Sequence, residues 1–269
     1  MTAVVGTRSG NVEDRESAIR LDSVSVRYRV PHERIWSVKE YVIRRVQRRV
    51  TYTDHWALRD IDLTIARGDV FGIVGANGAG KSTLLKLIAR VMSPTKGRVR
   101  VRGRVAPLIE VGAGFHPELT GRENVYLNAM LLGRARPEID AAFEAIVEFS
   151  GLHEFIDAPL RTYSTGMWAR LGFSVATAWQ PDILLLDEVL AVGDYEFKVR
   201  CQRRIAEFRA DGATTILVSH DLAAVDKTCE SAIWIDQGQV RAAGRAAEIT
   251  AAYRAGSDDA SAVALRTTG

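Results

Sequence analysis

The chain has 269 residues, 47% of them hydrophobic and 26% charged, a composition that supports a folded core and excludes disordered, collagen-like and disulfide-stapled chains. Its two cysteines, Cys201 and Cys229, and the lack of an apolar N-terminal leader predict a reduced, cytosolic setting. The apolar runs are far shorter than the roughly 20 residues of a transmembrane helix, so we expect no membrane span.

The net charge of +3 is unevenly distributed. Residues 32–50 carry six basic side chains against two acidic ones, so this segment holds more positive charge than the whole chain. A generally basic surface is therefore missing, and we expect no nucleic-acid partner. The local basic segment needs an explanation of its own.

The first third of the chain alternates between strand and helix patterns. Residues 1–17 are polar without periodicity, and we expect a disordered start. Alternating apolar residues predict strands over 21–28 and 56–65, and the apolar run 70–74 predicts a short buried strand. Between the first two strands, apolar residues from Ile35 recur every three or four positions among arginines, which predicts a basic amphipathic helix inside an insert at 29–55.

The remaining patterns predict an α/β domain over 18–256. Residues 112–180 read as mainly helical, including a helix over 137–149 with proline at its first position. Buried parallel strands are predicted over 183–186 and 215–218, an edge strand over 233–235 and a closing helix over 246–253. Residues 257–269 are small and polar, and we expect a loose tail.

A complete Walker A pattern follows the strand at 70–74 and precedes a helix predicted over 84–91. Glycines let consecutive backbone N–H groups point inward, and the helix N-terminus adds partial positive charge, so the loop can bind phosphates. Lys81 is predicted to reach the β and γ phosphates, and the Ser82 hydroxyl to bind Mg²⁺. The predicted phosphate-binding residues are Gly75, Ala76, Asn77, Gly78, Ala79, Gly80, Lys81, Ser82 and Thr83. An accidental glycine-rich turn is the weaker interpretation.

Two carboxylates, Asp187 and Glu188, end the strand predicted over 183–186, where open α/β sheets place ligand sites. Asp187 is predicted to orient the magnesium shell and Glu188 to polarise the attacking water. A surface acidic pair is the alternative. His220 follows the strand at 215–218 and can donate a hydrogen bond to a γ-phosphate oxygen, although a lone histidine beside a helix cap is a common structural feature.

A third segment, Tyr163-Ser164-Thr165-Gly166-Met167, precedes a helix predicted over 168–176. Serine and glycine at a helix N-terminus again favour anions. With these segments in this order, the chain resembles the nucleotide-binding subunit of an ATP-binding-cassette (ABC) transporter over residues 21–254. The resemblance implies a P-loop NTPase fold, with a RecA-like core, an antiparallel β part and a helical subdomain at about 112–180.

The resemblance also implies a homodimer that binds two ATP molecules with Mg²⁺ and hydrolyses them. It assigns Lys81, Glu188 and His220 to catalysis, and Glu110, near the family's usual coupling glutamine, to the magnesium side with Ser82 and Asp187. It also assigns Ser164, Thr165, Gly166 and Asp194 to nucleotide binding, with the Ser164 segment closing on the nucleotide that the other subunit holds. Adenine stacks on an aromatic residue, for which Tyr28 is favoured and Trp56 is the alternative.

Departures from the common pattern of the family indicate a subtype. Val189 stands where proline is usual, and the chain carries the string Thr120-Gly121-Arg122-Glu123-Asn124. These strings resemble ATPases that export lipid-linked polysaccharides, such as O-antigen, cell-wall galactan, teichoic acid or capsule. This implies a polytopic permease partner and a place at the cytoplasmic face of the membrane. An importer, a soluble ABC ATPase and a nucleotide-gated binding module are the alternatives, and Glu188 with His220 argues against the last.

The basic insert has two interpretations. A helix with valines on one face and arginines on the other can lie at an anionic membrane surface, each basic residue adding about 1 kcal/mol. The contacts to the pyrophosphate of a lipid-linked substrate would then be Tyr41, Arg44, Arg45, Arg48 and Arg49. Alternatively, a solvated helix packs its valines on the catalytic core.

Overall fold

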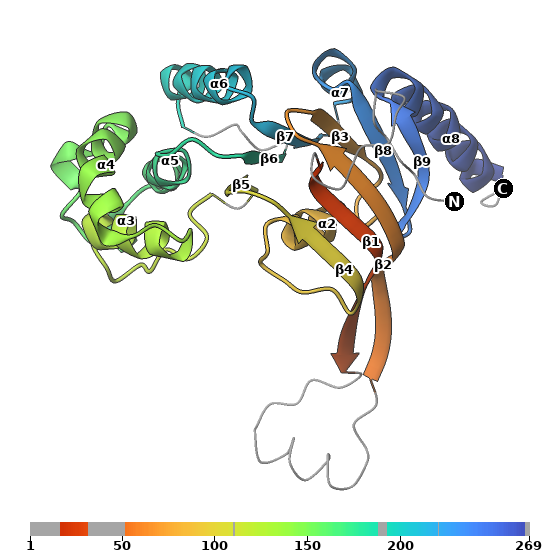
Figure 1. Ribbon diagram of the computed structural model, residues 1–269, viewed down its shortest axis with the longest axis horizontal. Coiled ribbons are helices and arrows are strands. Elements are labelled where there is room, and N and C mark those ends of the chain that lie inside the picture. Colours follow the sequence, from red (N-terminus) through yellow and green to blue (C-terminus); the bar gives the residue numbers. More distant parts are fainter. Residues whose placement is uncertain (1–16, 32–51, 110, 188–192, 220, 267–269) are drawn as a thin grey trace, which may run out of the picture.

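The structure is a computed structural model that describes residues 17–31, 52–109, 111–187, 193–219 and 221–266 (Figure 1). The predicted disordered start, apart from Ser17, and the predicted helix of the basic insert lie outside these residues. So do Glu110, Glu188 and His220.

Two sheets organise the described chain. An antiparallel sheet has the order β2-β1-β4, formed by β1 (Ser17–Pro31), β2 (Tyr52–Ala66) and β4 (Lys96–Val101). The larger sheet has the order β5-β6-β7-β3-β8-β9, in which only the β8–β9 pair is antiparallel. Its strands are β3 (Val70–Val74), β5 (Val105–Leu108), β6 (Ile183–Asp187), β7 (Thr214–Val218), β8 (Ser231–Asp236) and β9 (Gln239–Arg245).

The central strands β3, β6 and β7 confirm the strands predicted from apolar runs, because strands covered on both faces need continuous apolar sequence. The strand predicted over 233–235 exists as β8, but the prediction that it forms the edge of the sheet is wrong. β9 pairs with β8 on its outer side, with Ala243 opposite Ile233. A two-residue turn with positive φ at Gln237 (45°) and Gly238 (78°) joins these strands. Small residues in β9 hide the apolar alternation by which a strand is recognised.

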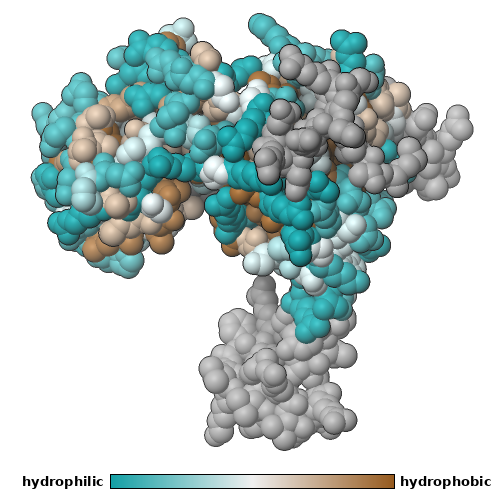
Figure 2. Space-filling view, viewed as in Figure 1, coloured by the Kyte–Doolittle hydropathy of each residue, from teal (hydrophilic) through white to brown (hydrophobic). Residues whose placement is uncertain are grey.

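The β1–β2 hairpin is longer than the alternation predicts. Pairing continues to Pro31 and Tyr52, beyond the predicted limits at 28 and 56. Asp54 forms ion pairs with Arg27 (2.8 Å) and Arg29 (3.6 Å), so polar pairs replace apolar ones in this part of the hairpin. The hairpin extends away from the sheets in Figure 1, and its described part is mostly hydrophilic on the face seen in Figure 2.

Helices α3, α4 and α5 form a separate lobe beside the sheets (Figure 1), which confirms the helical region predicted at 112–180. The predicted closing helix extends past 253 to Arg266, into the residues expected to be loose. Among the described residues, no helix combines the length and hydropathy that crossing a membrane needs. The helices are α2 (Lys81–Ile88), α3 (Gly121–Leu131), α4 (Arg136–Ser150), α5 (Thr165–Ala176), α6 (Tyr195–Ala210), α7 (Leu222–Thr228) and α8 (Ala246–Arg266), with 3₁₀ turns η1 (His153–Phe155) and η2 (Leu160–Thr162).

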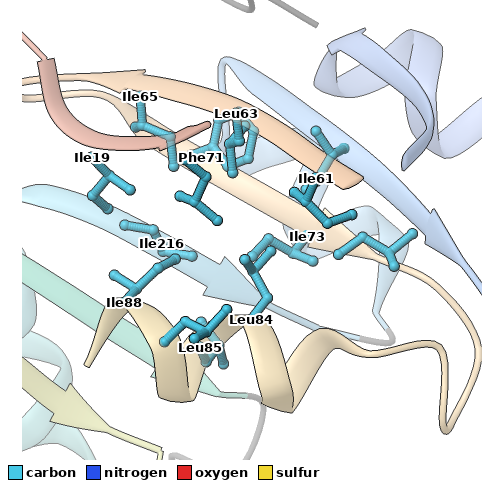
Figure 3. Close-up of a cluster of buried hydrophobic side chains, with 14 of the residues drawn as sticks. Ile19, Ile61, Leu63, Ile65, Phe71, Ile73, Leu84, Leu85, Ile88 and Ile216 are labelled. Carbon is cyan, nitrogen blue, oxygen red and sulfur yellow. The ribbon is translucent and has the colours of Figure 1, made fainter. Parts of the chain in front are cut away.

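The main core fixes the direction of α2. Figure 3 shows Leu84, Leu85 and Ile88 of this helix pointing toward the strands that carry Ile73 and Ile216. All five side chains are fully buried, and each such burial stabilises the fold by about 1.5–3 kcal/mol. The helix therefore has its N-terminus held at the end of β3, where the phosphate loop lies.

The helical lobe has a core of its own, built from α3, α4 and α5. Val125, Ile139, Ile146 and Leu171 are completely or almost completely buried in it. A further buried cluster joins this lobe to the large sheet, because Phe173 of α5 packs with Leu184 of β6 and Phe197 of α6.

Candidate functional site

The loop from Gly75 to Gly80 depends on two glycines. Gly75 has φ of 153°, and a Cβ added to it would lie 2.2 Å from the Ile235 carbonyl oxygen. Gly80 has φ of 111°, and its added Cβ would lie 2.6 Å from the Ala57 carbonyl oxygen. Both neighbours are backbone atoms that cannot move aside, so the close approach of the chains requires glycine at both positions.

Lys81 begins α2 with its side chain turned back into the loop. Its ammonium donates hydrogen bonds to the carbonyl oxygens of Gly75 (2.6 Å) and Ala76 (2.9 Å), and the residue is 7% exposed. The helix N-cap, Gly80, offers no side-chain oxygen to the first-turn N–H groups. A buried ammonium and uncapped N–H groups at one helix end form the anion-binding arrangement predicted from the sequence.

A cleft of about 450 Å³ lies over this loop. It brings together predicted residues that are far apart in sequence: Tyr28, Asn77, Gly78, Gly80, Lys81, Ser82, Thr83 and Asp187. The lining also includes His55, Ala57 and Val218, which the sequence analysis did not select. His55 pairs with Tyr28 across the hairpin, so recognising the β1–β2 register would have identified it.

Tyr28 lines the cleft and Trp56 is absent from the described lining. Neighbouring residues of a strand point to opposite faces, and His55 faces the cleft with Tyr28. Trp56 is instead flanked by Arg27 and Lys96, each 5.5 Å from its ring centroid. Of the two aromatic residues predicted for adenine, Tyr28 therefore lines the cleft and Trp56 does not, and the Tyr28 hydroxyl lies 3.7 Å from the Met92 sulfur.

The cleft contains the oxygen donors that Mg²⁺ requires. Ser82 and Asp187 both line it, the first at the start of α2 and the second at the end of β6. Mg²⁺ is commonly held by one or two protein oxygens together with phosphates and water, and these two residues fit that pattern. Within the described part of the chain, no group of three His, Cys, Asp or Glu residues forms a separate metal site.

Ser219 and Asp221, the residues before and after His220, both make hydrogen bonds. The Asp221 carboxylate caps α7 by accepting from the N–H groups of Ala223 (3.0 Å) and Ala224 (3.2 Å). The Asp221 N–H donates to the Ser219 hydroxyl oxygen (3.0 Å), and Ser219 is buried. These bonds fix the chain on both sides of His220 at the end of β7.

The second anion-binding segment lies in the helical lobe. Ser164 is the N-cap of α5 and accepts a hydrogen bond from the Met167 N–H (3.2 Å), as its position before a helix predicts. Thr165 and Gly166 form the first helical residues. None of the three is among the residues that line the cleft of the same chain. In one chain, the phosphate loop and the segment predicted as a second anion-binding end therefore lie at separate places.

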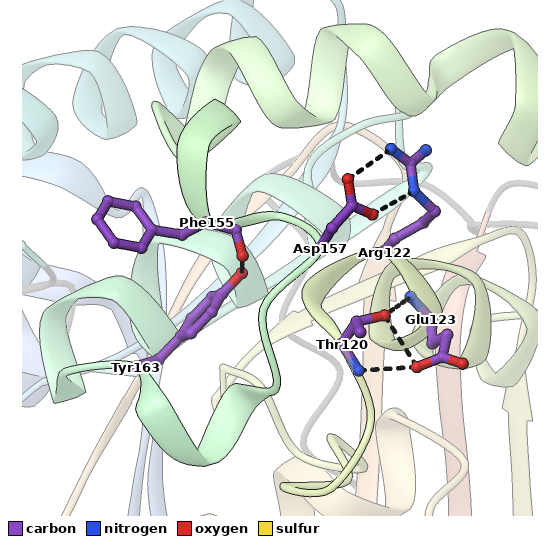
Figure 4. Close-up of polar contacts among 6 residues, drawn as sticks. All are labelled: Thr120, Arg122, Glu123, Phe155, Asp157 and Tyr163. Atoms are coloured by element: carbon purple, nitrogen blue, oxygen red, sulfur yellow. Dashed lines mark hydrogen bonds and ion pairs between the residues drawn. The ribbon is translucent and has the colours of Figure 1, made fainter.

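The string from Thr120 to Asn124 forms the start of α3, in the same lobe as this segment. Figure 4 shows the Thr120–Glu123 capping box at the start of α3 and the ion pair of Arg122 with Asp157 (2.7 Å). Asn124 is fully buried and donates to three carbonyl oxygens, those of residues 116, 119 and 120. The string thus has a structural role in the lobe.

Tyr163, the first residue of the segment, packs its hydroxyl close to Gly121 at the start of α3. Its hydroxyl donates to the Phe155 carbonyl oxygen (2.7 Å), as Figure 4 shows. Burial raises the pKa of Tyr163 to about 12, which keeps the phenol protonated and able to donate. Gly121 leaves the room that the hydroxyl needs, since an added Cβ would lie 2.3 Å from it.

Asp194 is placed as the N-cap of α6. Its carboxylate accepts from the Phe197 N–H (2.8 Å), and Arg170 lies 3.6 Å from its second oxygen. Like Ser164, it is absent from the described lining of the cleft. The structure therefore gives Asp194 a helix-capping role that the sequence analysis did not predict.

Comparisons with known proteins agree with this geometry. Residues 58–191 match the ABC transporter family. The chain is 46% identical over 241 residues to the O-antigen export system ATP-binding protein RfbB of Klebsiella pneumoniae, covering 89% of this chain and 98% of that protein. It is 44% identical to the teichoic acids export ATP-binding protein TagH of Lactococcus lactis, covering 74% of this chain and 43% of that protein.

The fold also agrees with solved structures. The dimeric, post-hydrolysis ATP-binding cassette MJ0796 bound to ADP and Pi aligns with a TM-score of 0.63 at 21% identity, over 85% of this chain and 98% of that one. The match confirms the expected α/β fold with its antiparallel part and helical lobe. By its phosphate loop, its cleft and its relatives, the chain belongs to the ABC transporter family, as an ATP-binding and ATP-hydrolysing subunit.

Proposed function

We propose that the chain is the ATPase subunit of an exporter that moves a lipid-linked polysaccharide across the cytoplasmic membrane, working as a homodimer. The observation that carries the dimer is the separation of the two anion-binding ends, since Ser164 caps α5 in one lobe while Lys81 lines the cleft of the other. A second copy can bring its Ser164 end to the nucleotide of the first.

ATP then acts as the bridge between two copies. Lys81 and His220 of one subunit hold the γ-phosphate from one side, and Ser164 and Gly166 of the other subunit hold it from the opposite side. Ser82 and Asp187 would hold Mg²⁺, and the ion would neutralise phosphate charge. Tyr28 stacks on adenine, and Glu110 joins the magnesium side. These roles rest on the sequence pattern and on the lining of the cleft.

Hydrolysis removes the bridge. Glu188 follows directly after Asp187 and polarises the water that attacks the γ-phosphate. Loss of the γ-phosphate weakens the attraction between the two copies, so the dimer opens. Closure and opening pass to a polytopic permease, which places the subunit peripherally at the cytoplasmic face of the membrane.

The export of a glycan is supported by the names of the relatives, which are O-antigen and teichoic acid export ATP-binding proteins. The RfbB protein with 98% of its length covered favours an O-antigen type of substrate. A teichoic acid exporter is the second candidate, favoured by the TagH match over 74% of this chain. A cell-wall galactan or a capsule as substrate rests on the sequence pattern alone.

The decisive experiment traps the complex. A tagged Glu188→Gln chain is purified from its native membranes with ATP, and the copurifying proteins and lipids are identified by mass spectrometry. We expect a polytopic permease in equal amount, with or without a polyprenyl-linked sugar, because the variant binds ATP and hydrolyses it slowly. Lys81→Ala is the matched control, since it weakens ATP binding and prevents closure. Ribosomal proteins or nucleic acid without a membrane protein would contradict the proposal.

A further inference from the structure

Two helix ends, the C-terminus of α4 and the N-terminus of α6, meet at one arginine of α5. The Nε of Arg170, in α5, donates to the carbonyl oxygen of Ser150 at the end of α4 (2.9 Å). Its Nη1 lies 3.6 Å from the carboxylate of Asp194, the N-cap of α6. Its guanidinium also lies 5.3 Å from the ring centroid of Phe197, in the first turn of α6. Arg170 therefore contacts both helices that flank α5 at this point.

The surroundings hold this guanidinium in one place. Phe197 is fully buried beneath it, and only 23% of the Arg170 side chain is exposed. Gly151 ends α4 with φ of 65°, and an added Cβ there would lie 2.6 Å from Nη2 of Arg170. A planar group that stacks on a ring and donates in fixed directions fits this place, and a lysine ammonium does not.

The arginine joins two ends with a shared task. Ser164 begins α5 six residues before Arg170, and Asp194 begins α6. In the proposed homodimer both ends belong to one subunit and approach the nucleotide bound by the other. If the Ser164 and Asp194 helix ends keep a fixed spacing, ATP can contact both ends without the entropy cost of immobilising either one.

We propose that Arg170 is a positioning residue that sets the spacing between the Ser164 and Asp194 helix ends and so controls ATP-driven closure of the dimer. The inference rests on the proposed homodimer. It assigns Arg170 no contact with nucleotide, and the phosphate loop of the same chain is independent of it, because the cleft lining does not include Arg170.

Arg204 provides a matched control. It also stacks on a phenyl ring, 4.6 Å from the centroid of Phe149, and also donates to a carbonyl oxygen, that of Thr177 (2.9 Å). Its ion pair is with Glu207 of its own helix and not with a helix end that meets the partner. Removing it therefore loses similar packing without changing the link to Asp194.

The test measures ATP-driven dimerisation in the Glu188→Gln background by analytical ultracentrifugation, together with the affinity for a fluorescent ATP analogue and the melting temperature. Arg170→Met removes the link. Asp194→Asn removes the charge but keeps a good N-cap. We expect each to weaken dimerisation about tenfold, and the double variant to weaken it no further than Arg170→Met alone, because Arg170→Met already removes the ion pair that Asp194→Asn breaks. Analogue affinity should stay within about twofold.

Each other result overturns the proposal. Equal weakening by Arg204→Met would mean that general loss of lobe packing is responsible. Additive effects of Arg170→Met and Asp194→Asn would show that the two residues act separately. If the Glu188→Gln parent dimerises with ATP and Arg170→Met dimerises equally well, the role of Arg170 is disproved while the proposed dimer stands. A parent that stays monomeric with ATP would overturn the proposed dimer itself, and this inference with it.

Discussion

At the scale of single residues, the two aromatic candidates for adenine stacking are separated by the face of the strand they occupy. Replacing Tyr28 with alanine should lower ATP affinity by about 1–3 kcal/mol, the value of an aromatic stack on a base. Trp56→Ala should leave ATP affinity unchanged, since Trp56 stacks on Arg27 and Lys96 outside the cleft. Calorimetric titration measures the ATP affinity of both variants. An equal loss of affinity in the two would show that adenine does not stack on Tyr28.

The two cysteines give a prediction about thiol chemistry. Both are buried, and burial raises the pKa of Cys201 and of Cys229 to about 12. The reactive thiolate is therefore scarce at pH 8, because the raised pKa favours the protonated thiol. Iodoacetamide should label neither cysteine in the native protein and both in guanidinium chloride. Mass spectrometry counts the labels, and native labelling would mean that these sites open readily.

At the scale of elements, one tight contact supports the Ser164 segment. An alanine Cβ at Gly121 would lie 2.3 Å from the Tyr163 hydroxyl and 2.8 Å from the Ile156 carbonyl oxygen. We expect Gly121→Ala to reduce the free energy of unfolding by about 1–3 kcal/mol, as overpacking does, and to lower ATPase activity.

Gly244→Ala is its control, because the added Cβ would meet only ordinary contacts at 3.5 and 3.7 Å. Denaturant unfolding compares the two variants with the parent. A Gly121→Ala protein as stable as the parent would show that Tyr163 moves aside without cost.

At the scale of the whole molecule, the basic insert predicts an effect on export that is separate from ATP hydrolysis. Its sequence predicts that Arg44→Glu with Arg45→Glu reduces glycan export while the ATPase activity of the purified subunit stays normal, because we expect these arginines to bind an anionic membrane surface and take no part in hydrolysis. Arg203→Glu with Arg209→Glu changes the net charge equally on α6. Export measured in cells and ATP hydrolysis measured in solution separate the two effects. Unchanged export in the insert variant would leave the solvated-helix interpretation.

Long-range contacts limit what could be predicted. The register of the β1–β2 hairpin determines which of Tyr28, Trp56 and His55 face the cleft. β9, whose small residues show no strand pattern, pairs with β8, so β8 is not at the predicted edge. Arg170 and Asp194 are 24 positions apart, and no local pattern links them. In each case the deciding contact joins residues that are distant in sequence.

The sequence by itself determined the phosphate loop and its chemistry, because a strand, six loop residues and a helix that follow one another along the chain fix their geometry through local backbone preferences. The family and the order of its elements followed from the same local signals. Only the tertiary structure decided which aromatic residue faces the cleft, that Ser164 lies outside the cleft of its own chain, and that Asp194 caps a helix beside Arg170. These depend on sheet register and on packing between lobes, which no short stretch of sequence encodes.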